Sequence, residues 1–165
     1  ESVLTLIGPF QLKAYIIDSF QHLGIKISQD LKWIDISKIH TTNLPDEIEI
    51  NSEEMKHQIS CWGYRISDGR KKMVFITDTL PNANAVNLAE NADVLIHEAT
   101  FSHHMREKAV DHFHSTEIQA MEIADKSNVQ RLILTHFSPR LTDRDIRKWT
   151  WNGKPCVVYD EKQEI

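Results

Sequence analysis

Three stretches of the chain repeat one pattern, in which a short apolar run ends abruptly in polar residues. A run of this kind predicts a strand that is buried on both faces. The runs and the polar residues at their ends are residues 73–77 with Asp78 and Thr79, residues 94–96 with His97, Glu98 and Thr100, and residues 131–135 with His136. Function in layered α/β proteins collects at such strand ends, so we expect these polar side chains to meet at one edge of a sheet.

Apolar residues at helical spacing occupy much of the rest of the chain. They predict a helix after Gly8-Pro9 that stops at Gly24, a short helix at residues 81–91 and a last helix near residues 143–149. A further helix has Ser115 or Thr116 as its cap, with Gln119 completing a capping box from Thr116. On this helix we expect Ile118 and Met121 to be core residues.

Alternating β-branched and polar residues predict strands in the first half of the chain. The expected strands lie at residues 2–7, twice between residues 32 and 50, and in a three-stranded meander between residues 55 and 78. The first strand of the meander carries His57, and Asp68-Gly69 forms a tight turn before the third strand. A strand at residues 156–159 completes the chain. Strands first dominate and later alternate with helices, which predicts an α/β fold with helices packed on the sheet.

The composition narrows the class of protein. A chain of 165 residues is expected to form one domain with a sizeable core. The net charge of −5 argues against sequence-independent coating of nucleic acid, but it allows a local basic patch that docks RNA phosphates. Cys61 and Cys156 form no C-x-x-C pair, which favours two reduced core thiols. Without an apolar run of about 18 residues, the chain is expected to be soluble and cytoplasmic, with no membrane contact.

Metal ligands are suggested by three residues of the meander and the strand ends. Asp78, His57 and His136 supply the carboxylate and imidazole groups that zinc or manganese binds, and an aspartate can bridge two ions. Each residue alone also has a structural explanation, because single histidines are mostly on the surface and an aspartate at a strand end often forms a turn. Their combination favours a metal site.

Several short segments resemble, in wording and order, the second half of one enzyme family. They are HEATF at 97–101, HST at 114–116, LTHFS at 134–138, ITDT at 76–79, and His57 followed by Gly-Tyr-Arg at 63–65. Together they resemble tRNase Z, the endonuclease that processes the 3′ end of transfer RNA and has the metallo-β-lactamase fold. The resemblance implies an αββα sandwich, of which residues 1–165 would be a single domain forming the C-terminal half.

The resemblance also implies roles for individual residues. His57 would bind one metal ion, His136 the other, and Asp78 would bridge them. His114, oriented by Glu98, would donate a proton to the leaving 3′ oxygen. The chemistry agrees, because a carboxylate beside an imidazole raises its pKa and keeps it charged at neutral pH. A structural alternative for Glu98 is a cap or an ion-pair partner. The implied cofactor is zinc, two ions in the complete protein, with manganese as an alternative.

The chain also departs from the family pattern. The His-x-His-x-Asp-His motif, which supplies most of the metal ligands in the family, is absent from residues 1–165. The family places this motif upstream, so we expect the missing half to precede Glu1. With three ligands where two ions need roughly seven, this chain alone should bind metal poorly. Only a short hairpin joins Arg65 to Asp78, where many short tRNase Z proteins insert a long arm that grips transfer RNA. Thr77 and Gln58 stand where glycine is usual.

Three functions follow as hypotheses. The leading one is a zinc-dependent phosphodiesterase, an endoribonuclease that processes the 3′ end of precursor tRNA and, by family resemblance, forms a homodimer. The second keeps the fold and the metal but acts on another phosphodiester, an ester or a lactone. The third is a metal-poor, non-enzymatic fragment that acts as a binding module.

Two further clusters have both a functional and a structural explanation. A histidine-rich connection could bind its own zinc ion, although histidines on a polar connection more often face solvent; its members are His103, His104, His112 and His114. A basic cluster near the end could dock phosphates or could be a solvated helix face, and we favour the second; it contains Arg140, Arg144, Arg147 and Lys148, with Trp149 and Trp151 beside them.

Overall fold

A computed structural model describes residues 4–25, 31–38 and 40–157 of the chain. The chain divides into two compact units, residues 1–42 and residues 43–165. The smaller unit is a β-α-β arrangement, in which β1 (Leu4–Gly8) pairs in parallel with β2 (Leu31–Asp35). The connecting helix α1 (Phe10–His22) begins directly after Pro9, and Gly24 beyond its end has a left-handed φ of 67°. The first strand, predicted at residues 2–7, is confirmed from residue 4 onward, and its first two residues lie outside the described part. The predicted helix and its stop at Gly24 are also confirmed.

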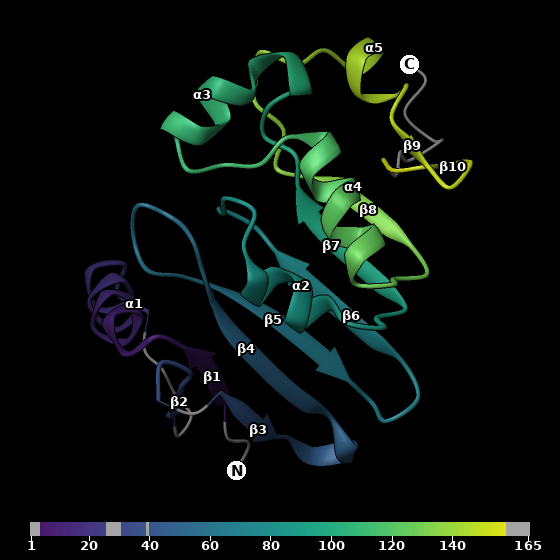
Figure 1. The fold of residues 1–165 in the computed structure, drawn as a ribbon. Coiled ribbons are helices and arrows are strands. Elements are labelled where there is room, and N and C mark those ends of the chain that lie inside the picture. Colours follow the sequence, from purple (N-terminus) through teal and green to yellow (C-terminus); the bar gives the residue numbers. More distant parts are fainter. Residues whose placement is uncertain (1–3, 26–30, 39, 158–165) are drawn as a thin grey trace, which may run out of the picture. The chain divides into compact units, whose positions relative to one another are not determined.

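The sheet of the larger unit is half antiparallel and half parallel (Figure 1). In the described residues of this unit the strand order is β4-β5-β6-β7-β8, and the short strand β3 (Thr41–Asn43) spans the division between the two units. The strands β4 (Glu49–Met55), β5 (Cys61–Ser67) and β6 (Lys72–Ile76) form an antiparallel meander. The strands β7 (Val94–Glu98) and β8 (Leu132–Thr135) continue in parallel with β6. Their carboxyl ends therefore meet at one edge, as the three apolar runs predict.

Two helices cover one face of this sheet. Helix α2 (Ala83–Ala89) packs on β4, β5 and β6, and α4 (Glu117–Lys126) packs on β7 and β8 (Figure 1). The core between them is apolar and includes Val74, Ile76, Leu95, Leu88 and Ala120. Gly63 allows the close approach of α2, because a Cβ there would lie 2.9 Å from the Leu88 side chain. The short helix expected at residues 81–91 and the Thr116–Gln119 capping box of α4 are confirmed.

The remaining described elements are short. They are the 3-10 turns Pro45–Glu47 and His103–Met105, helix α3 (Arg106–Asp111), helix α5 (Asp143–Ile146), and the hairpin of β9 (Thr150–Trp151) and β10 (Lys154–Pro155). Among the helices described, none combines the length and the apolar character needed to cross a bilayer. The single domain expected for residues 1–165 stays a prediction.

Several predicted boundaries were wrong. His57 is not on a strand: β4 ends at Met55, and the chain bends at His57 after an isolated bridge from Lys56 to Leu80. Ile118 is 38% exposed, because the buried face of α4 contains Ala120, Ile123 and Ala124 instead.

The end of the chain also differs from the expectation. The last helix stops at Ile146 rather than near Trp149, after one capped turn. The expected strand at residues 156–159 is not formed at Cys156 and Val157, and its last two residues lie outside the described part. The segment nevertheless lies beside β8, since the Leu134 amide donates to the Cys156 carbonyl.

Candidate functional site

The parallel strands bring Asp78, Glu98 and His136 to the same edge of the sheet. The register pairs Glu98 at the end of β7 with Thr135 at the end of β8, one residue before His136. Asp78 lies two residues beyond the end of β6. Asp78 and His136 have left-handed φ angles of 53° and 57°, which non-glycine residues rarely adopt. Strained backbone of this kind collects at functional sites.

Glu98 is the buried centre of this edge, with no exposed surface. Its Oε1 accepts a hydrogen bond from the Thr79 amide at 2.5 Å, and its Oε2 accepts from the Thr100 hydroxyl at 2.6 Å and the Ser115 amide at 3.1 Å. Burial favours the neutral acid, but the hydrogen bonds from His114, Thr100 and Thr79 outweigh it and lower the pKa of Glu98. Glu98 is therefore ionised at neutral pH, and hydrogen bonds from the protein replace those that water would make to its carboxylate.

His114 is held by this carboxylate. Its Nδ1 lies 3.1 Å from each carboxylate oxygen of Glu98, and it lies between the end of α3 and the cap of α4. The neighbouring Phe113 has a left-handed φ of 60°, which reverses the chain before the cap. The hydrogen bond to Glu98 raises the pKa of His114, and burial opposes this only in part. Since a carboxylate can only accept, Nδ1 carries a proton and Nε2 is the group available for chemistry.

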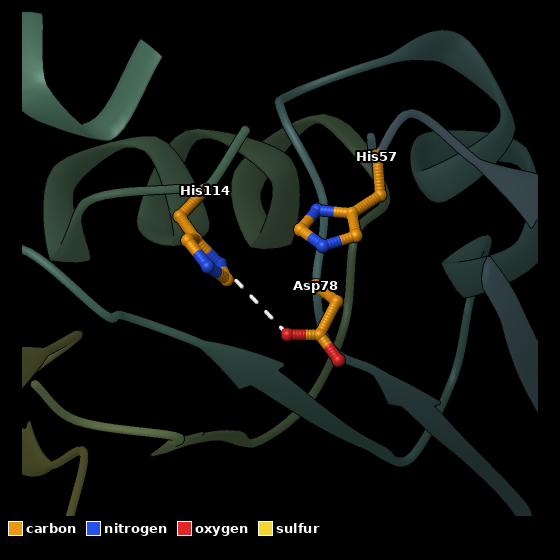
Figure 2. Close-up of side chains that lie close together, drawn as sticks. All are labelled: His57, Asp78 and His114. Atoms are coloured by element: carbon orange, nitrogen blue, oxygen red, sulfur yellow. Dashed lines mark ion pairs between the residues drawn. The ribbon is translucent and has the colours of Figure 1, made fainter. Parts of the chain in front are cut away.

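The ring of His57 is oriented by a backbone carbonyl rather than by Glu98. Its Nδ1 lies 2.9 Å from the carbonyl oxygen of Phe113, so Nδ1 donates and a neutral ring keeps the lone pair on Nε2. The residue before His57 is also held in place, because the Lys56 amide donates to the Thr79 hydroxyl at 3.1 Å. Figure 2 shows the rings of His57 and His114 both directed toward the Asp78 carboxylate. The His57 and His114 ring centroids are 5.1 Å apart.

His136 approaches the same carboxylate with its other nitrogen. Its Nε2 lies 3.4 Å from Asp78 Oδ1, and its Nδ1 lies 2.8 Å from the Thr100 hydroxyl. Zinc binds nitrogen and oxygen at about 2.0–2.2 Å, so neighbouring ligands of a tetrahedral ion are about 3.3–3.6 Å apart. The spacing of Asp78 and His136 therefore fits two ligands of one ion. Metal-binding histidines also usually have the second ring nitrogen tied to an acceptor, as His57 and His136 do.

Two groups of side chains have ligand atoms within 4.8 Å of one another in the described part of the chain. One is His57, Asp78 and His114, and the other is Glu98, His114 and His136. The structure thus brings together all five residues predicted for the site. Their division into the metal ligands His57, Asp78 and His136 and the proton-transfer residues His114 and Glu98 stays a prediction.

His97, the first residue of the HEATF segment, does not join this cluster. It alternates with Glu98 along β7 and is completely buried, with Nδ1 donating to the Glu98 carbonyl at 2.8 Å. Its Nε2 has no hydrogen-bond partner among the described atoms, and burial lowers the pKa of the ring. His97 is therefore a neutral core residue.

The histidine-rich connection forms no separate metal site in the described residues. His103 and His104 belong to neither ligand group, and His112 stacks on Phe101 with centroids 5.9 Å apart. Of the four histidines, His114 alone takes part in the site.

Sequence reasoning missed the groups that hold the site residues in place. Thr100, Thr79 and the Ser115 amide bind Glu98, and the Phe113 carbonyl binds His57. Thr100 and Thr79 were recognisable as polar residues at strand ends, but nothing in the pattern gave their partners. A backbone carbonyl such as that of Phe113 has no sequence signal at all.

A pocket of 320 Å³ opens beside His114 and His136. It is bounded by both histidines and by aromatic, polar and basic side chains, namely Thr100, Phe101, His112, Phe137, Ser138, Pro139 and Arg140. A planar group with a neighbouring anion would find aromatic walls and a guanidinium there.

Comparison with known proteins identifies the family. The profile of a family described as "Beta-lactamase superfamily domain" matches residues 7–137. The chain is 29% identical to Ribonuclease BN of Proteus mirabilis over 195 aligned residues, which cover 88% of this chain and 64% of that protein. This alignment is longer than the chain itself, so the relative contains insertions that the chain lacks. The chain spans less than two thirds of that relative.

Solved structures agree on the fold. Human tRNase Z, short form, superposes with a TM-score of 0.72 at 24% identity, over 85% of this chain and 63% of that chain. A metallo-β-lactamase fold protein from Bacillus subtilis superposes with a TM-score of 0.73 at 23% identity, over 94% of this chain and 62% of that chain. The resemblance to tRNase Z and the α/β metallo-β-lactamase fold are confirmed. The chain belongs to the β-lactamase superfamily.

Proposed function

We propose that this chain is part of a metal-dependent endoribonuclease that cleaves the 3′ end of precursor tRNA. The observation that carries the proposal is the Glu98–His114 pair beside the Asp78 carboxylate, with His57 and His136 on the same carboxylate. A buried acid-base pair next to a set of metal ligands is what hydrolysis of a phosphodiester requires. The tRNase Z resemblance supplies the substrate.

His57, Asp78 and His136 would hold the metal, with zinc as the proposed ion and two ions in the complete protein. When bound, the metal would lower the pKa of a water molecule and neutralise charge on the phosphate. The chain supports this role by its hydrogen bonds: the Phe113 carbonyl and Thr100 tie up Nδ1 of the two histidines, and Nε2 faces Asp78. Manganese shares the ligand preference and remains the alternative ion.

His114 would protonate the leaving 3′ oxygen. Its pKa is raised by Glu98, so the ring is more often charged at neutral pH and its Nε2 proton is available. Glu98 cannot compete as the donor, because it is buried, ionised and occupied by four hydrogen-bonding partners. The roles of the two residues therefore follow from which one can release a proton.

The pocket next to His114 and His136 favours a nucleotide as the substrate. Its aromatic walls can stack on a base, and Arg140 can pair with a phosphate neighbouring the cleaved bond. Homodimer formation belongs to this proposal on family resemblance alone, and a cytoplasmic location is carried over from the expectation made on the sequence.

One observation favours a second candidate, a hydrolase of the same family that acts on another phosphodiester, an ester or a lactone. The turn between β5 and β6 is a tight hairpin at Asp68, whose carboxylate accepts from the Arg70 and Lys71 amides. No tRNA-gripping arm fits in this connection, and the aligned relative contains insertions absent here.

Turnover of two substrates separates the candidates. The complete protein that contains this chain would be loaded with zinc and assayed with a precursor tRNA that has a 3′ trailer and with bis(p-nitrophenyl) phosphate. We expect cleavage of the precursor after the nucleotide preceding the trailer, with loss of activity in a His136→Ala variant. Cleavage of the small ester without cleavage of the precursor would transfer the assignment to the second candidate. Absence of both activities in metal-loaded protein would favour the binding module.

A further inference from the structure

We propose that Thr100 is a positioning residue whose hydroxyl fixes the tautomer of His136 through Glu98. Neither the metal-ligand roles implied by the family resemblance nor the proton transfer by Glu98 and His114 assigns a role to Thr100. It lies two residues after Glu98 at the end of β7 and is 8% exposed, so water has little access to its hydroxyl. Its hydrogen bonds must therefore be satisfied within the protein.

The first step concerns the proton of the Thr100 hydroxyl. Glu98 is ionised and accepts from backbone amides on both oxygens, from Thr79 on Oε1 and from Ser115 on Oε2. An ionised carboxylate has no proton to offer, so it can only accept from Thr100 as well. The contact of 2.6 Å between the Thr100 oxygen and Oε2 is typical of a hydroxyl that donates to a charged acceptor.

The second step concerns the nitrogen on the other side of the hydroxyl. The Thr100 oxygen lies 2.8 Å from Nδ1 of His136. A hydroxyl has one proton, and that proton is already donated to Glu98, so the oxygen must accept here. His136 therefore has its proton on Nδ1. The longer contact of 3.4 Å to Nδ1 of His114 does not compete, because that nitrogen donates to Glu98 at 3.1 Å.

The consequence appears at the opposite nitrogen of the same ring. With the proton on Nδ1, the neutral His136 has its lone pair on Nε2, which lies 3.4 Å from Asp78 Oδ1. A lone pair and a carboxylate facing each other at this distance bind a cation well. One buried carboxylate thus orders both the proton-donating pair and a metal ligand. The tautomer itself follows from the contacts alone, and its effect on metal binding rests on the proposed function.

Nitrogen-15 NMR of histidine-labelled protein measures the tautomer without metal and without substrate. At a pH above the histidine range, metal-free wild-type protein should show His136 as the Nδ1–H tautomer. Thr100→Val keeps the shape of the side chain and removes the hydroxyl, so His136 should change to the Nε2–H form and donate to Asp78. Thr100→Ser should restore the wild-type spectrum. Ser127→Ala is the matched control, because it removes a buried hydroxyl that binds the Val86 carbonyl on α2.

Cobalt titration then measures the effect on the ligand. We expect Thr100→Val to weaken cobalt binding roughly 10–100-fold, as loss of an outer hydrogen bond to a ligand histidine does elsewhere, with Thr100→Ser and Ser127→Ala near the wild type. An Nε2–H tautomer in wild-type protein would overturn the proposal, whether or not the valine variant folds. An unchanged tautomer in a folded Thr100→Val variant would do the same. A changed tautomer with unchanged cobalt affinity would overturn the proposed effect on metal binding. If the protein does not cleave precursor tRNA, the predicted NMR spectra are unchanged, because they depend on neither substrate nor metal.

Discussion

Replacing Glu98 by glutamine tests how the buried carboxylate supports the site. The amide has one acceptor oxygen and one donor nitrogen, whereas the native group accepts from donors on both oxygens. If the nitrogen faces Thr79, it meets the Thr79 amide. If it faces the other way, it meets the Thr100 hydroxyl and the Ser115 amide. Either orientation sets a donor against a donor.

The expected loss of stability is set by the amide orientation that loses fewer hydrogen bonds. At least one hydrogen bond to a charged group disappears, which lowers the free energy of unfolding by about 1.5–3 kcal/mol. For a chain of this size, that corresponds to a decrease in Tm of about 3–12 °C. The pKa of His114 should also fall, because the hydrogen bond that its Nδ1 donates to Glu98 is the largest contribution that raises it. Thermal unfolding and an NMR titration of His114 measure the two effects.

Glu117→Gln is the matched control for this change. Glu117 is another buried carboxylate, at the start of α4, and its Oε2 has no hydrogen-bond partner among the described atoms. The control should lose little stability and should leave the pKa of His114 unchanged. The account of Glu98 is wrong if Glu98→Gln leaves the His114 titration where it is in the wild type.

Three further changes test separate parts of the structure. Gly63→Ala should lower the free energy of unfolding by about 1–3 kcal/mol in a denaturant titration, because the new Cβ would lie 2.9 Å from Leu88; unchanged stability would show that α2 is not tightly packed. Burial lowers the pKa of His97 in the folded state. Above the ordinary pKa near 6.5 the ring is neutral in both states and does not affect stability, whereas below it the unfolded chain binds the proton more readily, so the fold loses stability as pH falls. His97→Leu should therefore weaken the loss of stability between pH 7 and 5, and a parallel curve would contradict the assignment. His112→Ala should leave the metal content of zinc-loaded protein unchanged while His136→Ala lowers it, and the reverse result in elemental analysis would revive a zinc site in the histidine-rich connection.

The sequence was informative where local chemistry decides the structure. The three apolar runs predicted buried strands whose polar ends meet at one edge, and the Thr116–Gln119 pair predicted the cap of α4. In both cases the signal and its physical cause lie within a few residues. Asp78 and His136 could be named for the same reason, since Asp78 lies two residues after β6 and His136 directly follows β8.

Contacts between distant segments could not be read in this way. His57 was wrongly assigned to a strand, because β4 ends at Met55. Its position is decided by contacts from distant segments, namely the Phe113 carbonyl at its ring and the Thr79 hydroxyl at the preceding Lys56 amide. His97 and Glu98 are neighbours in one polar motif, yet strand alternation buries one in the core and places the other in the site. Ile118 suggested a core position by its type, but the buried face of α4 contains Ala120, Ile123 and Ala124 instead.

Cleavage of a substrate with a sulfur leaving atom tests the central claim most directly. In a precursor tRNA whose scissile 3′ oxygen is replaced by sulfur, the leaving group departs without a proton. His114→Gln should reduce cleavage of the oxygen substrate roughly 10²–10⁴-fold, as loss of a general acid does, and should leave cleavage of the sulfur substrate close to the wild-type rate. An equal loss on both substrates would show that His114 does not protonate the leaving group and would contradict the mechanism built on the Glu98–His114 pair.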